Sequence, residues 1–173
     1  MYKTFLLLVF CCFLYIVAGC DKGIEPEPEK SPASEIIGFS GKVTFTGNWP
    51  TGITRTHIVV FKNDIVTVDD FSFLNLAFVV DSIPYRSQEF NYNSVMNNFF
   101  SFILAEGTYK YIVVAQSKTP TISLNREDWF IVGIYYSNGN TSKPGVLTLQ
   151  KGNITTGIDI NVDFNNPPPQ PPK

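Results

Sequence analysis

The stretch GIDINVDF, residues 157–164, decides the fold class that we expect for this chain. Apolar and polar side chains alternate strictly along it, with Ile158, Ile160, Val162 and Phe164 on one side and Asp159, Asn161 and Asp163 on the other. Successive side chains of a β-strand point to opposite faces of the sheet. The stretch therefore predicts a strand with one buried face and one solvated face.

The same strand-like pattern extends outward over most of the chain. Residues 39–46 alternate in the same way, and the other runs rich in β-branched and aromatic residues are each bounded by Gly, Pro, Asn or Asp. These runs are residues 56–62, 73–80, 99–104, 109–116, 129–136 and 146–150. About seven or eight short strands separated by turns predict an all-β fold, an antiparallel β-sandwich.

Two connections have the residues of tight turns. Residues 105–108, Ala-Glu-Gly-Thr, separate two strand runs and include a glycine, as a hairpin with a positive φ requires. Residues 137–140 contain Asn138-Gly139, a pair that favours turn conformations. We expect a hairpin at the first connection and a turn at the second.

One domain is expected over residues 35–164, since this length is rich in Ile, Val, Phe and Tyr and supplies one sizeable core. The tail NNPPPQPPK, residues 165–173, predicts a disordered, extended end outside that core. The formal net charge is −2 for the whole chain. This balance does not favour nucleic acid as a partner.

The front of the chain predicts a signal peptide over residues 1–19. It has a positive charge at Lys3, an apolar run over residues 5–16 and small residues just before Cys20. Residues 5–20 would reach about 24 Å as a helix, short of the roughly 30 Å of a hydrocarbon core. Residues 20–34 continue with prolines interleaved among glutamates, which predicts an extended acidic tether.

Residues 17–20, Val-Ala-Gly-Cys, resemble the lipobox of bacterial lipoproteins. The resemblance implies that the thiol of Cys20 is diacylated and becomes the first residue after cleavage, so the protein is held on a membrane by its N-terminal lipid. Two or three acyl chains anchor a protein stably, whereas one binds reversibly. The acidic residues behind Cys20 also resemble the surface-export signal of Bacteroidetes-type lipoproteins, whereas Asp21 alone resembles an inner-membrane retention signal.

A second resemblance concerns the folded part. The run FFSFILAEGTYKYIVVAQS, residues 99–117, resembles the signature of carboxypeptidase regulatory-like domains, and residues 38–50 and 152–164 resemble the opening and closing strands of the same group. The resemblance implies a transthyretin-like, or prealbumin-like, Greek-key sandwich without catalytic activity. Residues 63–98 exceed the matching region of compact members, and we expect a binding loop or an extra edge strand there.

The sequence carries no recognisable catalytic motif, so we predict neither an enzyme nor a cofactor. His57 is the only histidine, so it has no second histidine with which to hold zinc, and we interpret it as a strand or turn residue. Asp159, Asn161 and Asp163 begin like a calcium loop, but Phe164 stands where such a loop needs glycine. We therefore predict no metal site and interpret these three residues as a solvated strand face.

Aromatic residues are the candidate ligand-binding residues, namely Trp49, Tyr85, Tyr92 and Trp129. Aromatic faces beside Asn and Asp stack on sugars while the polar groups bond hydroxyls. A core position for Trp129 is the competing interpretation. The expected function is a lipid-anchored bacterial cell-envelope protein, in the outer membrane and at the cell surface, with a binding or assembly module. The alternatives are a carbohydrate-binding accessory lipoprotein and a structural subunit that pairs with an envelope protein through an edge strand.

Overall fold

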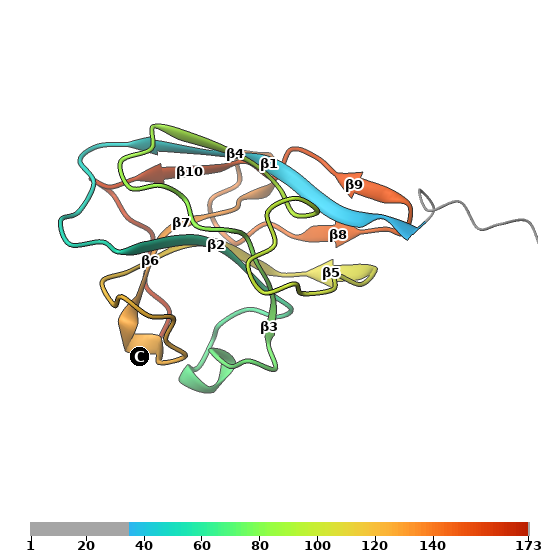
Figure 1. Ribbon diagram of the computed structural model, residues 1–173, viewed down its shortest axis with the longest axis horizontal. Helices are drawn as coiled ribbons and strands as arrows, with labels where there is room; N and C mark the ends of the chain where they lie inside the picture. The colour runs from blue at the N-terminus through green and yellow to red at the C-terminus, as the bar shows by residue number, and fades with distance from the viewer. Residues whose placement is uncertain (1–34, 173) are drawn as a thin grey trace, which may run out of the picture. The chain divides into compact units, whose positions relative to one another are not determined.

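Alternating side chains form strands over much of residues 35–172, the part of the chain that the computed structural model describes. The sheets are mainly antiparallel, which confirms the prediction of an all-β fold (Figure 1). The predicted signal peptide, Cys20 and the acidic tether lie outside the described residues. Within residues 35–172, no helix has the length and apolar character needed to cross a membrane.

The described residues contain short strands and shorter 3₁₀ helices. The strands are β1 (Ile37–Thr46), β2 (Arg55–Phe61), β3 (Leu76–Val79), β4 (Glu89–Asn93), β5 (Gly107–Tyr109), β6 (Tyr111–Ser117), β7 (Trp129–Ile134), β8 (Leu147–Leu149), β9 (Asn153–Thr155) and β10 (Ile160–Asp163). The 3₁₀ helices are η2 (Val68–Asp70), η3 (Arg126–Asp128) and η4 (Ser137–Gly139).

Strand β1 lies at the centre of one sheet. This sheet has the order β10-β1-β4, and β9 pairs with the first residues of β1. Strand β1 is antiparallel to β4 and parallel to both β9 and β10, a departure from a purely antiparallel sandwich. The second sheet, β3-β2-β6-β7, is antiparallel throughout, and β5 pairs with β8 in a separate ribbon.

The main core lies between the two sheets. Ile58 and Val60 of β2 and Ile112 of β6 join one buried cluster with Phe39 of β1 and Ile160 of β10. The strictly alternating stretch of the sequence contributes to this core as expected, because Ile158, Ile160 and Val162 are buried, Phe164 is partly buried, and the polar residues between them are exposed. The interpretation of Asp159, Asn161 and Asp163 as a solvated strand face is thus confirmed.

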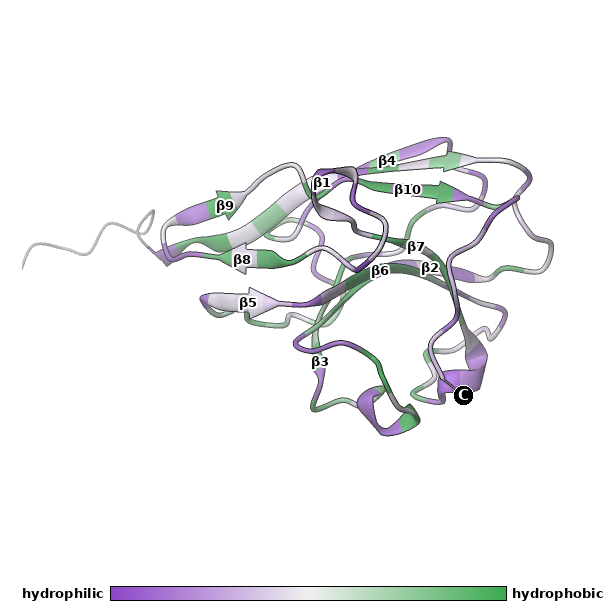
Figure 2. Cartoon of the chain, turned by 180° about the vertical axis from the view of Figure 1, so that it is seen from behind, coloured by the Kyte–Doolittle hydropathy of each residue, from purple (hydrophilic) through white to green (hydrophobic). Residues whose placement is uncertain are grey.

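The β3-β2-β6-β7 sheet is buried on its other face as well. Every residue of β6 is buried. The side chains on the face away from the main core form a second buried cluster, which contains Val59, Val113 and Ile131. Figure 2 shows β2 and β6 as strongly hydrophobic strands in the middle of the domain. Residues 111–115 of β6 are therefore a continuous apolar run, as is usual for a strand covered on both sides, and the strand ends with the buried polar residues Gln116 and Ser117.

Most of the predicted strand runs contain a strand, but the run at residues 99–104 does not. The side chain of Asn98 instead closes a loop, since its amide donates to the carbonyl of Phe102 and accepts from the Phe102 amide. The hairpin expected at residues 105–108 is therefore wrong, and β5 pairs with β8. The turn at Asn138-Gly139 is confirmed, with φ angles of 55° and 72°.

Residues 63–98, expected to hold a binding loop or an extra edge strand, contain η2 and two edge strands. Strand β3 is the edge of one sheet, and β4 is the edge of the other. The alternation pattern does not predict β4, because its sequence, EFNYN, places only Tyr92 in the core. The connection from β3 to β4 therefore passes from one sheet to the other.

The described residues 165–172 are extended and mostly exposed, as expected, but they are held on the domain by hydrogen bonds rather than free of it. The side-chain amide of Gln170 accepts from the Ile131 amide at 2.9 Å and donates to the Ile131 carbonyl at 2.7 Å. Arg126 donates to the carbonyl of Pro171, which is buried. The tail lies beside β7 at the edge of its sheet, and Pro171 lies beside η3 (Figure 1).

Gly41 occupies the position where the partner of β1 changes from β9 to β10. A Cβ atom there would overlap the main-chain carbonyl of Ile158. We expect Gly41→Ala to lower the free energy of unfolding by about 2–3 kcal/mol, because backbone must move to accept the methyl group. Urea unfolding followed by tryptophan fluorescence measures this change. The neighbouring control Ser40→Ala should stay within about 0.5 kcal/mol, and equal effects at both positions would contradict the packing described for β1.

Candidate functional site

Loops cover the second apolar face of the β3-β2-β6-β7 sheet, and they leave one apolar pocket open. The pocket has a volume of about 70 Å³. Its walls come from β2, β3, β6 and β7 and from the loops at residues 71–73, 100 and 122–124. The lining side chains are almost all apolar: Val59, Phe61, Phe71, Phe73, Leu76, Val79, Phe100, Ala115, Ile122, Leu124, Trp129 and Ile131, with His57, Ser72 and Ser123.

The rim of the pocket exposes large apolar side chains. Phe73 is 62% exposed, Phe100 is 47% exposed and Leu124 is 66% exposed. These residues lie on three separate loops, so the exposure surrounds the pocket. Contiguous exposed apolar surface on a soluble domain marks a site of interaction more often than a scattered apolar residue does.

His57 forms part of the pocket wall and is fully buried. Its Nδ1 atom lies 3.1 Å from the carbonyl oxygen of Val80. Its Nε2 atom is buried and has no hydrogen-bond partner within the described residues. The ring of Phe99 meets the imidazole edge to face at 4.9 Å between centroids, and that of Trp129 lies at 6.2 Å.

The tautomer of His57 follows from these contacts. A carbonyl oxygen only accepts, so Nδ1 carries the proton and Nε2 presents a lone pair. Burial lowers the pKa of His57 below its ordinary value of 6.5, and Arg55 lowers it further, against the opposing effects of the Val80 carbonyl and Asp81. The site therefore holds a neutral imidazole with one unused acceptor.

Trp129 fixes the loop that forms the far wall of the pocket. Its indole Nε1 donates to the carbonyl oxygen of Ser123 at 2.8 Å. The Ser123 hydroxyl donates to Asp128 and accepts from the amide of Asn125, and Asn125 caps η3. The indole N–H and the polar groups of this loop therefore have partners within the domain. Among the residues of 35–172 that line the pocket, His57 Nε2 is the one buried side-chain nitrogen or oxygen without a hydrogen-bond partner.

Arg126 connects this wall to the tail. The guanidinium donates to the carbonyls of Trp129 and Pro171, and it lies 5.9 Å above the ring of Phe71. Burial lowers its pKa, whereas burial raises the pKa of the nearby Tyr111 to about 12. The tail, η3 and the loop of Phe71 thus form one covering layer beside the pocket.

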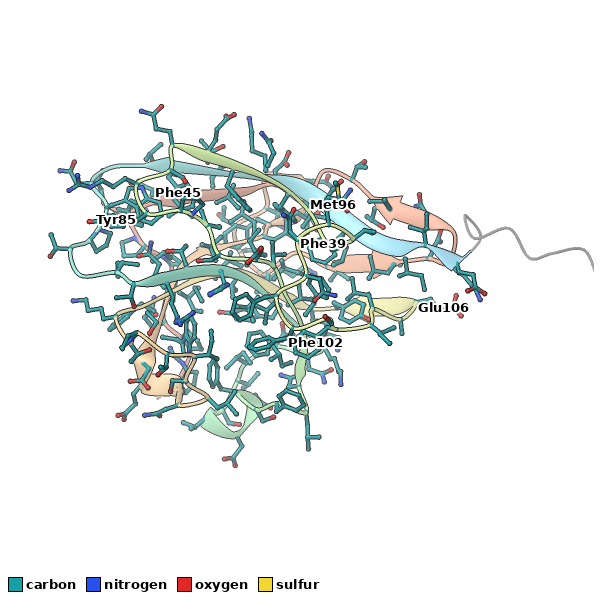
Figure 3. The ribbon with its side chains drawn as sticks, in the orientation of Figure 1. Phe39, Phe45, Tyr85, Met96, Phe102 and Glu106 are labelled. Carbon is teal, nitrogen blue, oxygen red and sulfur yellow. The ribbon has the colours of Figure 1, made fainter. Side chains whose placement is uncertain are left out.

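The aromatic residues chosen from the sequence do not form one site. Trp49 meets Tyr85 edge to face at 5.5 Å and packs against Phe45, and Figure 3 shows Phe45 and Tyr85 at one end of the domain. Tyr92 is buried and its hydroxyl donates to the Ile158 carbonyl, so it is not available to a ligand. Trp129 is also buried, as its competing interpretation expected, and lies at the pocket.

His57 is the functional candidate that the sequence interpretation passed over. It does lie in a strand, as expected, but its position in RTHIVVF places it on the same face as Val59 and Phe61. The sequence did contain a signal for this candidate, because a polar residue alternates there with apolar residues on one face of the strand. Within the described residues, no group of three or more His, Cys, Asp or Glu side chains lies close enough together to hold a metal ion.

Comparison of the chain with protein-family models, with curated proteins and with solved structures finds no match in any of the three.

His57 should make folding sensitive to acid. The unfolded chain binds a proton near pH 6.5, while the folded state resists protonation until a lower pH, so the free energy of unfolding falls as pH drops below 6.5. The loss attributable to His57 reaches at most about 1.4 kcal/mol per pH unit. Urea unfolding of the wild type and His57→Leu at pH 7.5 and pH 5.5 measures it. The variant should lose less stability than the wild type, and parallel losses would contradict the assignment.

Proposed function

We propose that this chain is a lipid-anchored bacterial envelope protein whose β-sandwich is a non-catalytic binding module. The observation that carries the binding role is the apolar pocket on the outer face of the β3-β2-β6-β7 sheet, ringed by the exposed side chains of Phe73, Phe100 and Leu124. Such a surface costs free energy in water, and a bound apolar group removes that cost.

The anchoring role rests on the sequence of the first twenty residues. Residues 17–20 carry the lipobox resemblance, and the proline-rich sequence of residues 21–34 predicts an extended tether. An N-terminal anchor with two or three acyl chains holds the domain at the outer membrane, with the cell surface as its proposed location.

For the fold we propose the transthyretin-like Greek-key type. The support is the order of the strands: β1 lies between β4 and β10, and β2 lies between β3 and β6. Chain connections pass between the two sheets after β1, after β3, between β4 and β6, and between β7 and β9, and repeated crossings of this kind are typical of Greek-key sandwiches.

The chemistry of the pocket favours binding over catalysis. Nucleophilic catalysis uses a hydroxyl or thiol bonded to a base, and His57 Nε2 has no such partner among residues 35–172. Burial of Tyr92 and Trp129 leaves Trp49 and Tyr85 as the remaining candidates for stacking on a sugar. Trp49 is itself partly buried and packs against Phe45 and Phe164, so we favour the apolar pocket over a glycan site.

Cys20→Ser tests the anchor. The wild-type protein should fractionate with membranes, and its N-terminal peptide should show the mass of acyl chains on Cys20 by mass spectrometry. In Cys20→Ser the acyl mass should disappear and the signal peptide should remain, because the modified thiol is absent. Cys12→Ser is the control and should be processed normally. An unmodified Cys20 in the wild type would sink the anchoring proposal.

Leu124→Ser tests the binding surface. The neutral dye Nile red should bind the full chain with increased fluorescence, and Leu124→Ser should weaken its binding about threefold or more, because apolar rim area is lost. Ile103→Ser is the matched control, since Ile103 is 94% exposed but does not line the pocket. Similar dye affinities for the two variants would show that the pocket is not the binding surface.

A further inference from the structure

The buried acceptor on His57 is a feature that packing alone does not account for. A buried polar atom without a hydrogen bond costs about 1–3 kcal/mol. Val80 satisfies Nδ1, but nothing within residues 35–172 satisfies Nε2. The imidazole belongs to the wall of an apolar pocket whose rim is exposed on three loops.

The rest of the pocket restricts what could supply the missing donor. None of the described residues that line it carries a formal charge, and the polar lining residues besides His57 are Ser72 and Ser123. A charged ligand group would be desolvated there without a counter-charge, at a high cost in free energy. A neutral hydroxyl loses far less solvation free energy when it enters the pocket, and it can donate a hydrogen bond to the lone pair of Nε2.

The size of the pocket restricts the shape of the ligand. A cavity of about 150 Å³ lined by apolar residues holds benzene, whereas this pocket offers about 70 Å³. It therefore takes a narrow group, such as one end of an alkyl chain. The remainder of the chain would lie on the rim formed by Phe73, Phe100 and Leu124.

We propose that the pocket binds a neutral aliphatic alcohol, with its alkyl chain on the apolar rim and its hydroxyl donating to Nε2 of His57. This inference rests on the proposed binding role of the pocket and adds the chemical class of the ligand. The specificity comes from the acceptor, because an analogue without a donor leaves Nε2 buried and unpaired.

Nε2 is buried in the free domain, so a neighbouring side chain must move before a ligand hydroxyl can reach it. The ring of Phe99 lies against the imidazole, while its backbone amide donates to the Val79 carbonyl at 3.1 Å and holds the main chain in place. In the proposed complex the Phe99 side chain turns away from the imidazole while this main-chain bond is kept.

The test uses 1-hexanol and 1-fluorohexane, which have the same chain and nearly the same size but differ in the hydrogen-bond donor. His57 is the only histidine, so the imidazole ¹⁵N signals of the full chain are unambiguous. Titration followed by NMR should give about tenfold tighter binding for the alcohol. The alcohol alone should shift the Nε2 signal toward that of a hydrogen-bonded nitrogen.

His57→Leu should bring the two affinities to within about twofold, since the acceptor is gone. If this variant does not fold, the change of the Nε2 signal in the wild type decides whether the hydroxyl bonds to His57. Equal affinities in the wild type with an unmoved Nε2 signal would overturn the alcohol assignment and leave the apolar binding role intact. No binding of either compound, together with equal Nile red affinities for Leu124→Ser and Ile103→Ser, would overturn both the alcohol assignment and the proposed binding role of the pocket.

Discussion

The apolar character of both faces of the β3-β2-β6-β7 sheet is the constraint on which the rest of this domain depends. One face meets the β10-β1-β4 sheet, as in any sandwich. The other carries Val59, Val113 and Ile131 and would be exposed in a simple two-layer fold. Loops and the C-terminal tail supply a third layer, which explains why the tail bonds to Ile131 and why residues 99–104 form a loop. The pocket lies where these covering segments do not close.

His57 links that packing to chemistry. The alternation of β2 places the imidazole on the face that must be covered, and the Val80 carbonyl fixes its proton on Nδ1. A leucine there would fill similar space without leaving an unpaired acceptor. The histidine therefore lowers the stability of the free domain, and it supplies an acceptor that could select a ligand in an apolar site. Stability lost at a position that can recognise a ligand is a common feature of functional sites.

Side-chain alternation was sufficient to predict the fold class, because a strand between core and solvent must alternate. The stretch at residues 157–164 and the run in β1 behave in this way. Alternation failed where tertiary contacts decided the outcome. Asn98 turns an apolar run into a loop, Gln170 holds a proline-rich tail on β7, and β4 pairs with β1 although its sequence is mostly polar. The sequence did not predict the pocket either, because THIVVF, residues 56–61, does not show that loops cover the second face of the sheet.

The central claim is that the outer face of the β3-β2-β6-β7 sheet receives the ligand. Intermolecular nuclear Overhauser effects from a bound neutral alcohol to protein side chains test it most directly. The account predicts contacts from the alkyl chain to Val59, Ala115 and Leu124, which line the pocket from two strands and a loop. Contacts to Trp49 and Tyr85 at the end of the domain, with none to the pocket, would contradict it.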